Sequence, residues 1–211
     1  MKFDLHVHSM YSHDSILSPE KIIKCAKKKG LSGIAVTDHN TIRGGLAASK
    51  INCDRDFNVI VGEEIKTEFG DIVALFVNKE IKARKFEEVI DEISEQGGMS
   101  VLAHPFRHFK TPEIIINKVD LVEGFNARSK AENNLRALQI AKIHNKSVCA
   151  GSDAHFYFEL GRGRTIANQE IEAALRKGNC AIEVEESNYY FVHGLSVSIE
   201  KIKSLVKMAK S

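Results

Sequence analysis

Short apolar segments alternate with amphipathic segments along most of this 211-residue chain, and this alternation constrains the fold more than any other feature. The apolar segments have the length of buried strands, and the amphipathic ones have the period of helices. Strands are expected at residues 3–8, 31–36, 57–61, 99–103, 119–125 and 147–150, and helices at 18–30, 45–50, 83–96, 131–144, 169–177 and 198–210. Repeated strand–helix units predict a parallel sheet, and this many units favour its closure into a barrel.

Three segments add detail to this α/β pattern. Residues 65–77 alternate around a Phe69-Gly70-Asp71 turn, which predicts a hairpin, and residues 180–184 are a candidate for one more strand. The Lys-rich helix expected at 198–210 is apolar on one face, so it is expected to pack against the body of the protein. The residues of that face are Ile199, Ile202, Leu205 and Val206.

The composition indicates an ordinary folded protein, with 43% apolar and 27% charged residues. We find no linker, so a single domain over residues 1–211 is expected. A net charge of +2 does not suggest long nucleic acid as an obligatory partner, and no obligatory protein partner is inferred. The chain shows no apolar leader and no run near the ~20 apolar residues of a membrane span, so a cytoplasmic location is expected. Its four cysteines are scattered without a paired spacing, which predicts free, reduced thiols.

Two histidines, His6 and His8, end the first apolar segment. On an extended strand residues i and i+2 point to the same face, so the two imidazoles would lie side by side. Neutral imidazole is the commonest metal ligand among side chains, and such a pair is suited to hold an ion. Taken alone, the pair is equally compatible with two half-buried histidines that form local hydrogen bonds.

Other polar residues occupy the same position, at the ends of successive strands. They are Asp38, His39, Glu64, His104, Asn126, Asp153 and His155. In a parallel barrel the carboxyl ends of the strands meet at one rim, so these side chains are expected to lie together with His6 and His8. Five histidines and three or four carboxylates are too many ligands for one tetrahedral zinc. They suit two or three divalent ions of Mn, Zn or Fe, and paired ions are suited to phosphoester hydrolysis.

Five motifs occur in order between Asp4 and Thr165, namely HVHSxYSxDS, TDHNT, GEEI, AHPF and GSDAH. Together they closely resemble the motifs of the PHP (polymerase and histidinol phosphatase) family of metal-dependent phosphoesterases. The resemblance implies a distorted, TIM-barrel-like (β/α)7 barrel with a trinuclear metal centre.

The resemblance assigns the metal ligands position by position. They are His6, His8, Asp14, His39, Glu64, His104, Asp153 and His155. His6 and His8 would bind one ion together with Asp153. Glu64 would bridge that ion to a second ion, which His104 also binds. The other three ligands would hold the third ion.

Three positions near these ligands leave alternatives open. Glu64 is preferred over Glu63 as the ligand, because the family pattern has an apolar residue between the glycine and the ligand. His13 lies beside Asp14 and is expected to be exposed or to support a ligand. Related proteins often carry a histidine where this chain has Asp71, which could be either a ligand of the second ion or a turn residue.

Residues without a ligand role are also candidates for the site. Asp38 could orient a histidine or serve as a capping or loop residue. Arg43, Arg107, Arg128 and Arg162 follow strand-end motifs; of these, Arg107 and Arg128 are favoured as phosphate contacts. His108, His144 and His193 have no motif around them and are expected to be structural or exposed.

The expected activity is hydrolysis of a small phosphomonoester, a nucleotide or a short oligonucleotide end through a metal-activated hydroxide. One alternative is an amidohydrolase-like metal hydrolase, which usually adds a metal-bridging lysine that this chain lacks after its strands. Another is a non-catalytic barrel subunit of an RNA–protein complex, for which eroded ligand motifs and a basic face would be expected.

Overall fold

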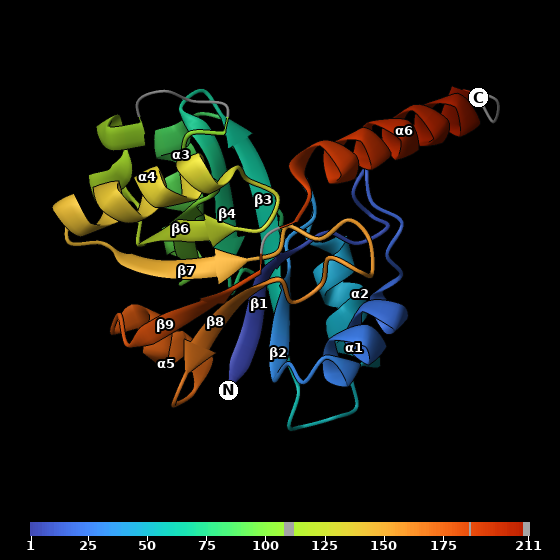
Figure 1. The fold of residues 1–211 in the computed structure, drawn as a ribbon, viewed down its shortest axis with the longest axis horizontal. Helices are drawn as coiled ribbons and strands as arrows, with labels where there is room; N and C mark the ends of the chain where they lie inside the picture. The colour runs from blue at the N-terminus through green and yellow to red at the C-terminus, as the bar shows by residue number, and fades with distance from the viewer. Residues whose placement is uncertain (108–111, 186, 209–211) are drawn as a thin grey trace.

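The computed structural model describes residues 1–107, 112–185 and 187–208, and within them one nine-stranded sheet curls into a nearly closed barrel (Figure 1). The strands are β1 Lys2–Val7, β2 Gly33–Val36, β3 Asn58–Thr67, β4 Gly70–Leu75, β5 Met99–Leu102, β6 Leu121–Asn126, β7 Ser147–Gly151, β8 Gly163–Ala167 and β9 Cys180–Val184. Their order in the sheet is β7-β6-β5-β4-β3-β2-β1-β8-β9.

Parallel and antiparallel pairing alternate in blocks along this sheet. The pairs β1–β2, β2–β3, β5–β6 and β6–β7 are parallel, whereas β4 runs antiparallel to both β3 and β5. Strand β8 runs antiparallel to β1 and β9. The predicted α/β barrel is therefore confirmed, and its distortion comes from these antiparallel strands.

The barrel closes where the end of β7 meets β1 and β8. Asp153 N donates to His6 O at 2.7 Å, and His8 N donates to Ala154 O at 2.9 Å. Gly151 allows this approach, because a Cβ atom at this position would lie only 2.3 Å from the Cβ of His6. The closure brings the segment 151–155 directly against the two histidines of β1.

Six α-helices of the described chain surround the barrel. They are α1 Pro19–Lys28, α2 Arg43–Ile51, α3 Phe86–Glu95, α4 Ala131–Ile143, α5 Ile171–Arg176 and α6 Tyr189–Met208, and two 3-10 helices cover Pro112–Ile114 and Ile116–Lys118. Helices α1 and α2 lie beside β2, whereas α3 and α4 lie on the other side of the molecule, over β4 to β6 (Figure 1). None of the described helices is both long and apolar enough to cross a membrane.

A change of register in β1 positions the two histidines. Leu5 packs in the cluster inside the barrel, whereas Val7 packs in the outer cluster with the helix residue Ile22. Strict alternation would place Leu5 and Val7 on the same face. The pairing of β1 with β2 shifts between Asp4 and Val7. This irregularity turns Val7 to the outer face, so that His6 and His8 lie together at the end of the barrel.

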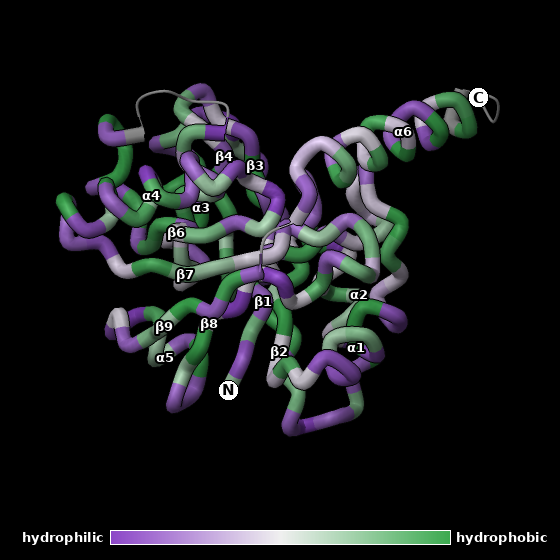
Figure 2. The backbone as a smooth tube through the Cα atoms, in the orientation of Figure 1, coloured by the Kyte–Doolittle hydropathy of each residue, from purple (hydrophilic) through white to green (hydrophobic). Residues whose placement is uncertain are grey.

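Helix α6 differs from the prediction in both length and packing. It begins at Tyr189, nine residues before the expected start, and its second half extends beyond the barrel (Figure 1). The prediction that its C-terminal apolar residues pack against the body is wrong, because Ile202 is 55% and Leu205 is 65% exposed. Figure 2 shows hydrophobic positions on the part of α6 that projects. The helix instead makes its body contacts through another face, which includes the buried Val192 and Ser196.

Two further differences concern the hairpin and strand β8. The hairpin turn lies at residues 68–69, so Asp71 belongs to strand β4 and the alternative of a turn residue is wrong. Strand β8 was not expected. All four cysteines are free thiols, as expected, and only Cys149 is fully buried.

Candidate metal centre

Most of the candidate ligands line a cleft of about 350 Å³ at the end of the barrel, and His6 and His8 are buried next to them. The residues that line it lie in β3 and β4 or in the segments that follow β1, β2, β5, β6 and β7, and helix α6 forms one of its walls. The structure brings together every ligand position that the sequence predicted, in four overlapping groups whose ligand atoms lie within 4.8 Å of one another. Among the described residues these groups are His8, Asp14, His39 and His155; His6, His8 and Glu64; His6, His104 and Asp153; and Glu64, Asp71 and His104.

Ser12 fixes the ring orientation of His8. Its Oγ lies 3.0 Å from Nδ1 of His8, accepts a bond from the main-chain N–H of His39 at 3.0 Å, and donates to Oδ1 of Asp38 at 3.0 Å. A hydroxyl has one proton and two lone pairs, so with its proton on Asp38 it accepts from Nδ1–H of His8. Nε2 of His8 then faces the carboxylates of Glu64 and Asp153, each with an oxygen 3.2 Å away.

Asp38 thus acts on His8 rather than on the ring of its neighbour His39. The carboxylate is fully buried and also accepts bonds from the main-chain N–H and the hydroxyl of Ser9, each at 2.6 Å. It does not line the cleft. Asp38 bonds to Ser12, which in turn bonds to Nδ1 of His8. A carboxylate in this position holds the tautomer that a metal ligand needs.

Glu123 plays the same part for His6. Its Oε1 lies 3.0 Å from Nδ1 of His6, and its Oε2 accepts bonds from the main-chain N–H of His104 at 2.7 Å and from Nδ2 of Asn126 at 3.0 Å. His104 has a left-handed backbone with a φ of 28°. One buried carboxylate therefore orients the ring of His6 and anchors the strained main chain of His104.

The nitrogen and oxygen atoms that remain face one another at short distances. Nε2 of His6 and Nε2 of His8 are 3.1 Å apart. Oε2 of Glu64 is buried and has no hydrogen-bond partner, although His39 Nδ1 lies 3.1 Å away and His8 Nε2 lies 3.2 Å away. Lone pairs at these distances repel one another unless a proton or a cation lies between them, and imidazole with carboxylate is a donor set that Mn, Zn and Fe accept. The donor set therefore fits divalent ions.

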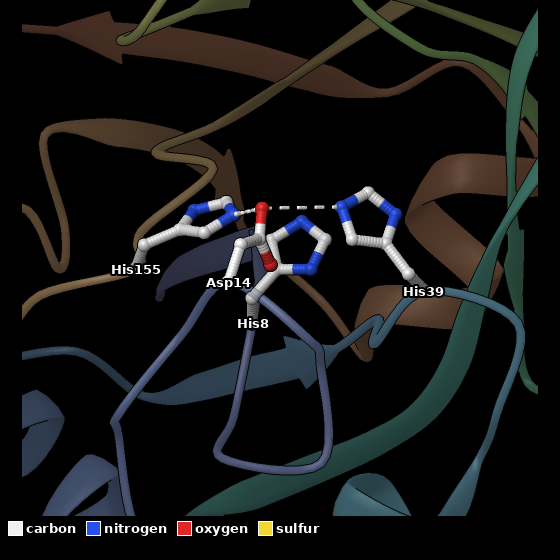
Figure 3. A group of neighbouring side chains, drawn as sticks. All are labelled: His8, Asp14, His39 and His155. Atoms are coloured by element: carbon white, nitrogen blue, oxygen red, sulfur yellow. Dashed lines mark hydrogen bonds and ion pairs between the residues drawn. The ribbon is translucent and has the colours of Figure 1, made fainter. Parts of the chain in front are cut away.

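A second part of the centre surrounds Asp14, which lies in the loop after β1 (Figure 3). Oδ2 of Asp14 is 2.7 Å from Nε2 of His155 and 3.6 Å from Nε2 of His39, while its Oδ1 is buried and has no partner. Figure 3 shows the three rings of His8, His39 and His155 around this carboxylate. The group has the composition expected for the third site.

Asp71 joins the group around Glu64 and His104. It lies in β4, opposite Lys66 of β3, and its Oδ2 is 3.9 Å from Nδ1 of His104. Nε2 of His104 is 2.8 Å from Oε1 of Glu64. The position that departs from the family pattern therefore still directs a carboxylate to the centre.

Burial and charge shift the pKa values of the ligands in opposite directions. Burial alone would lower the pKa of His8, but the carboxylates of Asp153 and Glu64 outweigh it and raise this pKa to about 10. Burial alone would raise the pKa of Glu64, but the neighbouring histidines hold it well below its usual range. Burial, His8 and Arg128 lower the pKa of His155 to about 3, so this ring is neutral at pH 7. The acids are therefore ionised and available as ligands.

Both favoured arginines line the cleft. Arg107 donates to Oδ2 of Asp153 at 2.7 Å and to Oδ1 of Asn126 at 2.5 Å. Arg128 lies 2.5 Å from Nδ1 of His155, and its other terminal nitrogen bonds to helix α6. Arg107 thus supports Asp153, whereas Arg128 connects His155 with α6. By contrast, the guanidinium of Arg43 lies over the ring of Tyr11.

Other positions that the sequence singled out have different surroundings. His13 is exposed, as expected, and lies 3.9 Å from Glu200. Glu63 is buried on the other side of β3, where it accepts a bond from Ile81 N, and burial raises its pKa to about 7. His144 is partly buried, and His108 lies outside the described residues. His193 lines the cleft, and its Nδ1 lies 2.7 Å from the main-chain oxygen of Tyr189 in the same helix.

Sequence reasoning missed two contributors to the centre. Glu123 lies in the middle of a buried apolar strand, Leu121–Asn126, and an acid at such a position was a usable signal. Helix α6 carries His193 and Ser196 to the cleft, which no local pattern indicated. Both depend on partners far away in the sequence.

Comparison with known proteins agrees with this geometry. The model of the PHP domain matches residues 4–187. The chain belongs to the PHP family. An uncharacterized protein of Methanocaldococcus jannaschii is 39% identical over 166 residues, which cover 71% of this chain and 97% of that protein. A second uncharacterized protein of the same organism is 35% identical over 175 residues, covering 76% of this chain and 68% of that protein.

A solved structure shares the fold of this PHP chain. It is a two-domain protein from Bacteroides vulgatus that contains a predicted PHP-like metal-dependent phosphoesterase. The two structures superpose with a TM-score of 0.74 at 18% sequence identity, over 88% of this chain and 65% of that chain. This PHP chain thus spans about two thirds of the length of that protein.

Proposed function

We propose that this PHP-family chain is a metal-dependent phosphoesterase that hydrolyses a small phosphomonoester, a nucleotide or a short oligonucleotide end. The observation that carries the proposal is the convergence of five imidazoles and four carboxylates on one cleft, with Arg107 at its wall. A cleft of about 350 Å³ is at the small end of the range for ligand pockets, which favours a small substrate.

In this proposal the centre holds two or three ions of Mn, Zn or Fe. His6, His8, Asp153 and Glu64 would hold one ion, and Glu64 and His104 would hold a second. The grouping of Asp71 with Glu64 and His104 supports Asp71 as a further ligand there. When bound, such ions polarise a phosphoryl group, activate a water molecule and offset charge on the leaving oxygen.

The third ion in this proposal lies between Asp14, His39 and His155, the group drawn in Figure 3. Its ligands come from three separate loops, which follow β1, β2 and β7. His8 belongs to this group as well as to the first, so it connects the two parts of the centre.

The remaining residues orient ligands and substrate. Glu123 and Ser12 keep Nδ1 of His6 and His8 occupied, so that both rings present Nε2 to the cleft. Asp38 holds Ser12 in that orientation. Arg107 keeps Asp153 in place and brings positive charge to the wall of the cleft, where it offsets the charge of a substrate phosphate.

The two alternative functions are less well supported. An amidohydrolase-like site would be expected to use a bridging lysine, and no lysine lines the cleft in the part of the chain that the structure describes. A non-catalytic RNA–protein subunit would be expected to lose ligands, whereas the predicted ligand positions converge here.

The test is metal analysis followed by a substrate screen. Protein purified under metal-replete conditions is expected to carry two or three ions per chain and to hydrolyse an aryl phosphate when Mn²⁺ is supplied. Phosphomonoesters, nucleotides and short oligonucleotides are then compared by kcat/KM. Fewer than one ion per chain would contradict the multinuclear centre, and hydrolysis of amides but not of phosphate esters would favour the amidohydrolase alternative.

A further inference from the structure

Helix α6 contacts both segments that carry the candidate third site. The first contact passes through Arg128, whose Nη2 donates to the main-chain oxygen of Val192 at 2.7 Å and to Oγ of Ser196 at 2.8 Å. The other terminal nitrogen of Arg128 lies 2.5 Å from Nδ1 of His155. Arg128 and Ser196 are both buried, so this contact connects α6 with the ring of His155 inside the protein.

The second contact passes through Lys203, in the second half of α6. Its Nζ donates to three main-chain oxygens of the loop 9–15, at 3.0 Å to Met10, 2.6 Å to Ser12 and 2.5 Å to Ser15. An ammonium group has three donors and no acceptor, so the three carbonyls use all of them. Lys203 is partly buried here, which distinguishes it from the exposed Lys201 on the same helix.

The loop that Lys203 binds carries Asp14, the only carboxylate of the group in Figure 3. The same loop also reaches the other ligands. Ser12 Oγ holds the ring of His8, and Ser15 Oγ donates to the main-chain oxygens of His8 and His155 at 2.8 and 3.2 Å. A shift of this loop would therefore displace Asp14 relative to the histidine rings.

The other ligand groups are held differently. Glu64 lies in strand β3, and Glu123 orients His6 and His104 from strand β6. In the described structure no hydrogen bond connects α6 with these four residues. The contacts of α6 are thus directed to one site of the centre.

We propose that Lys203 is a positioning residue for the third metal site, and that α6 sets the affinity of this site through two contacts, that of Lys203 with the loop 9–15 and that of Ser196 with Arg128. Removing the ammonium leaves three main-chain carbonyls without their donor, so the loop gains freedom and Asp14 is no longer fixed opposite His39 and His155. The inference rests on the metal centre of the proposed function, but it does not depend on which ester is hydrolysed.

The test compares Lys203→Met with Lys201→Met in the full chain. Methionine keeps the apolar stem and removes the donors, and Lys201 is a matched control on the solvent side of α6. Equilibrium dialysis against Mn²⁺ alone, with elemental analysis, gives the number of ions and their affinities. For Lys203→Met we expect one ion per chain to bind about 10-fold or more weakly, a typical effect for groups that support metal ligands, with smaller changes for the other ions. Lys203→Arg, which retains donors, should restore most of the affinity.

The inference is overturned if Lys203→Met binds all ions as the parent does, or if all ions weaken equally. Should Lys203→Met fail to fold, Ser196→Ala tests the contact through Arg128, where a smaller loss confined to the same ion is expected and no change overturns the inference. If the parent chain binds no metal, the proposed function and the inference both fail. If the parent binds metal but hydrolyses no phosphate ester, only the proposed function fails.

Discussion

The two parts of the candidate metal centre are held in place by different kinds of structure. Around His6, Glu64 and His104 the ligands belong to barrel strands or follow them directly, and Glu123 restrains two of them from a neighbouring strand. Around Asp14 and His155 the ligands lie in loops, which α6 holds through side-chain contacts.

This difference indicates which ligands of the centre are held rigidly and which are not. Strand ends are fixed by sheet hydrogen bonds and by the apolar clusters beneath them, so their ligands need few further contacts. Loops lack the hydrogen bonds of a sheet, and their positions depend on individual side chains from other parts of the chain. We call the ligands around His6, Glu64 and His104 the strand-held part, and those around Asp14 and His155 the loop-held part. We expect surface substitutions to change metal affinity in the loop-held part more than in the strand-held part.

The largest expected effect comes from removing a ligand of the strand-held part. Asp153→Ala, like His8→Ala, should lower kcat/KM for an aryl phosphate by roughly three orders of magnitude, because the ion and its orientation are both lost. Asp14→Ala should cost less, because the remaining ions still polarise the phosphoryl group. Asp91→Ala, at an exposed position of α3, is the matched control and should be neutral. Equal losses for Asp153→Ala and Asp14→Ala would erase the distinction between the two parts.

A smaller effect is expected when a supporting carboxylate is neutralised. Glu123→Gln keeps the size of the side chain but removes the charge that holds Nδ1–H of His6, so Mn²⁺ affinity should fall about 10- to 100-fold. The loss should concern the strand-held ions and leave the ion near Asp14 unchanged. Calorimetric titration with Mn²⁺ checks this, with Glu132→Gln on the exposed side of α4 as the control. A loss confined to the ion near Asp14 would contradict the assignment of Glu123 to the strand-held ions.

The smallest effect concerns pH. Before an ion binds, the carboxylates of Asp153 and Glu64 outweigh burial and raise the pKa of His8 to about 10, so the ring is protonated at pH 7. The ring must release this proton to become a ligand, so Mn²⁺ affinity should fall as the pH falls, by about tenfold per pH unit for each proton released. His155, with a pKa lowered to about 3, should release none. Titration in buffers of different ionisation enthalpy counts the protons, and an affinity independent of pH would contradict this expectation.

Much of the fold could be predicted because periodicity is a local property of the sequence. The apolar segment at residues 99–103 became β5, and the amphipathic segment at 131–144 became α4. Strand β8 escaped prediction because Gly163–Ala167 is short and mixed, and it becomes a strand through pairing with β1 and β9. The start of α6 was missed because a run of aromatic residues followed by Gly194 disfavours a helix locally.

The sequence by itself determined which residue types stand at the strand ends, and therefore that a centre of histidines and carboxylates would form on one rim of a barrel. Only the tertiary structure decided what orients those ligands. Glu123 meets His6 across 117 positions of the sequence, and Lys203 meets the loop of Asp14 across nearly the whole chain. Such contacts leave no periodic trace, because they arise when the sheet closes and α6 returns to the rim. The sequence thus determines the candidate ligands, and the closure of the fold determines how firmly each one is held.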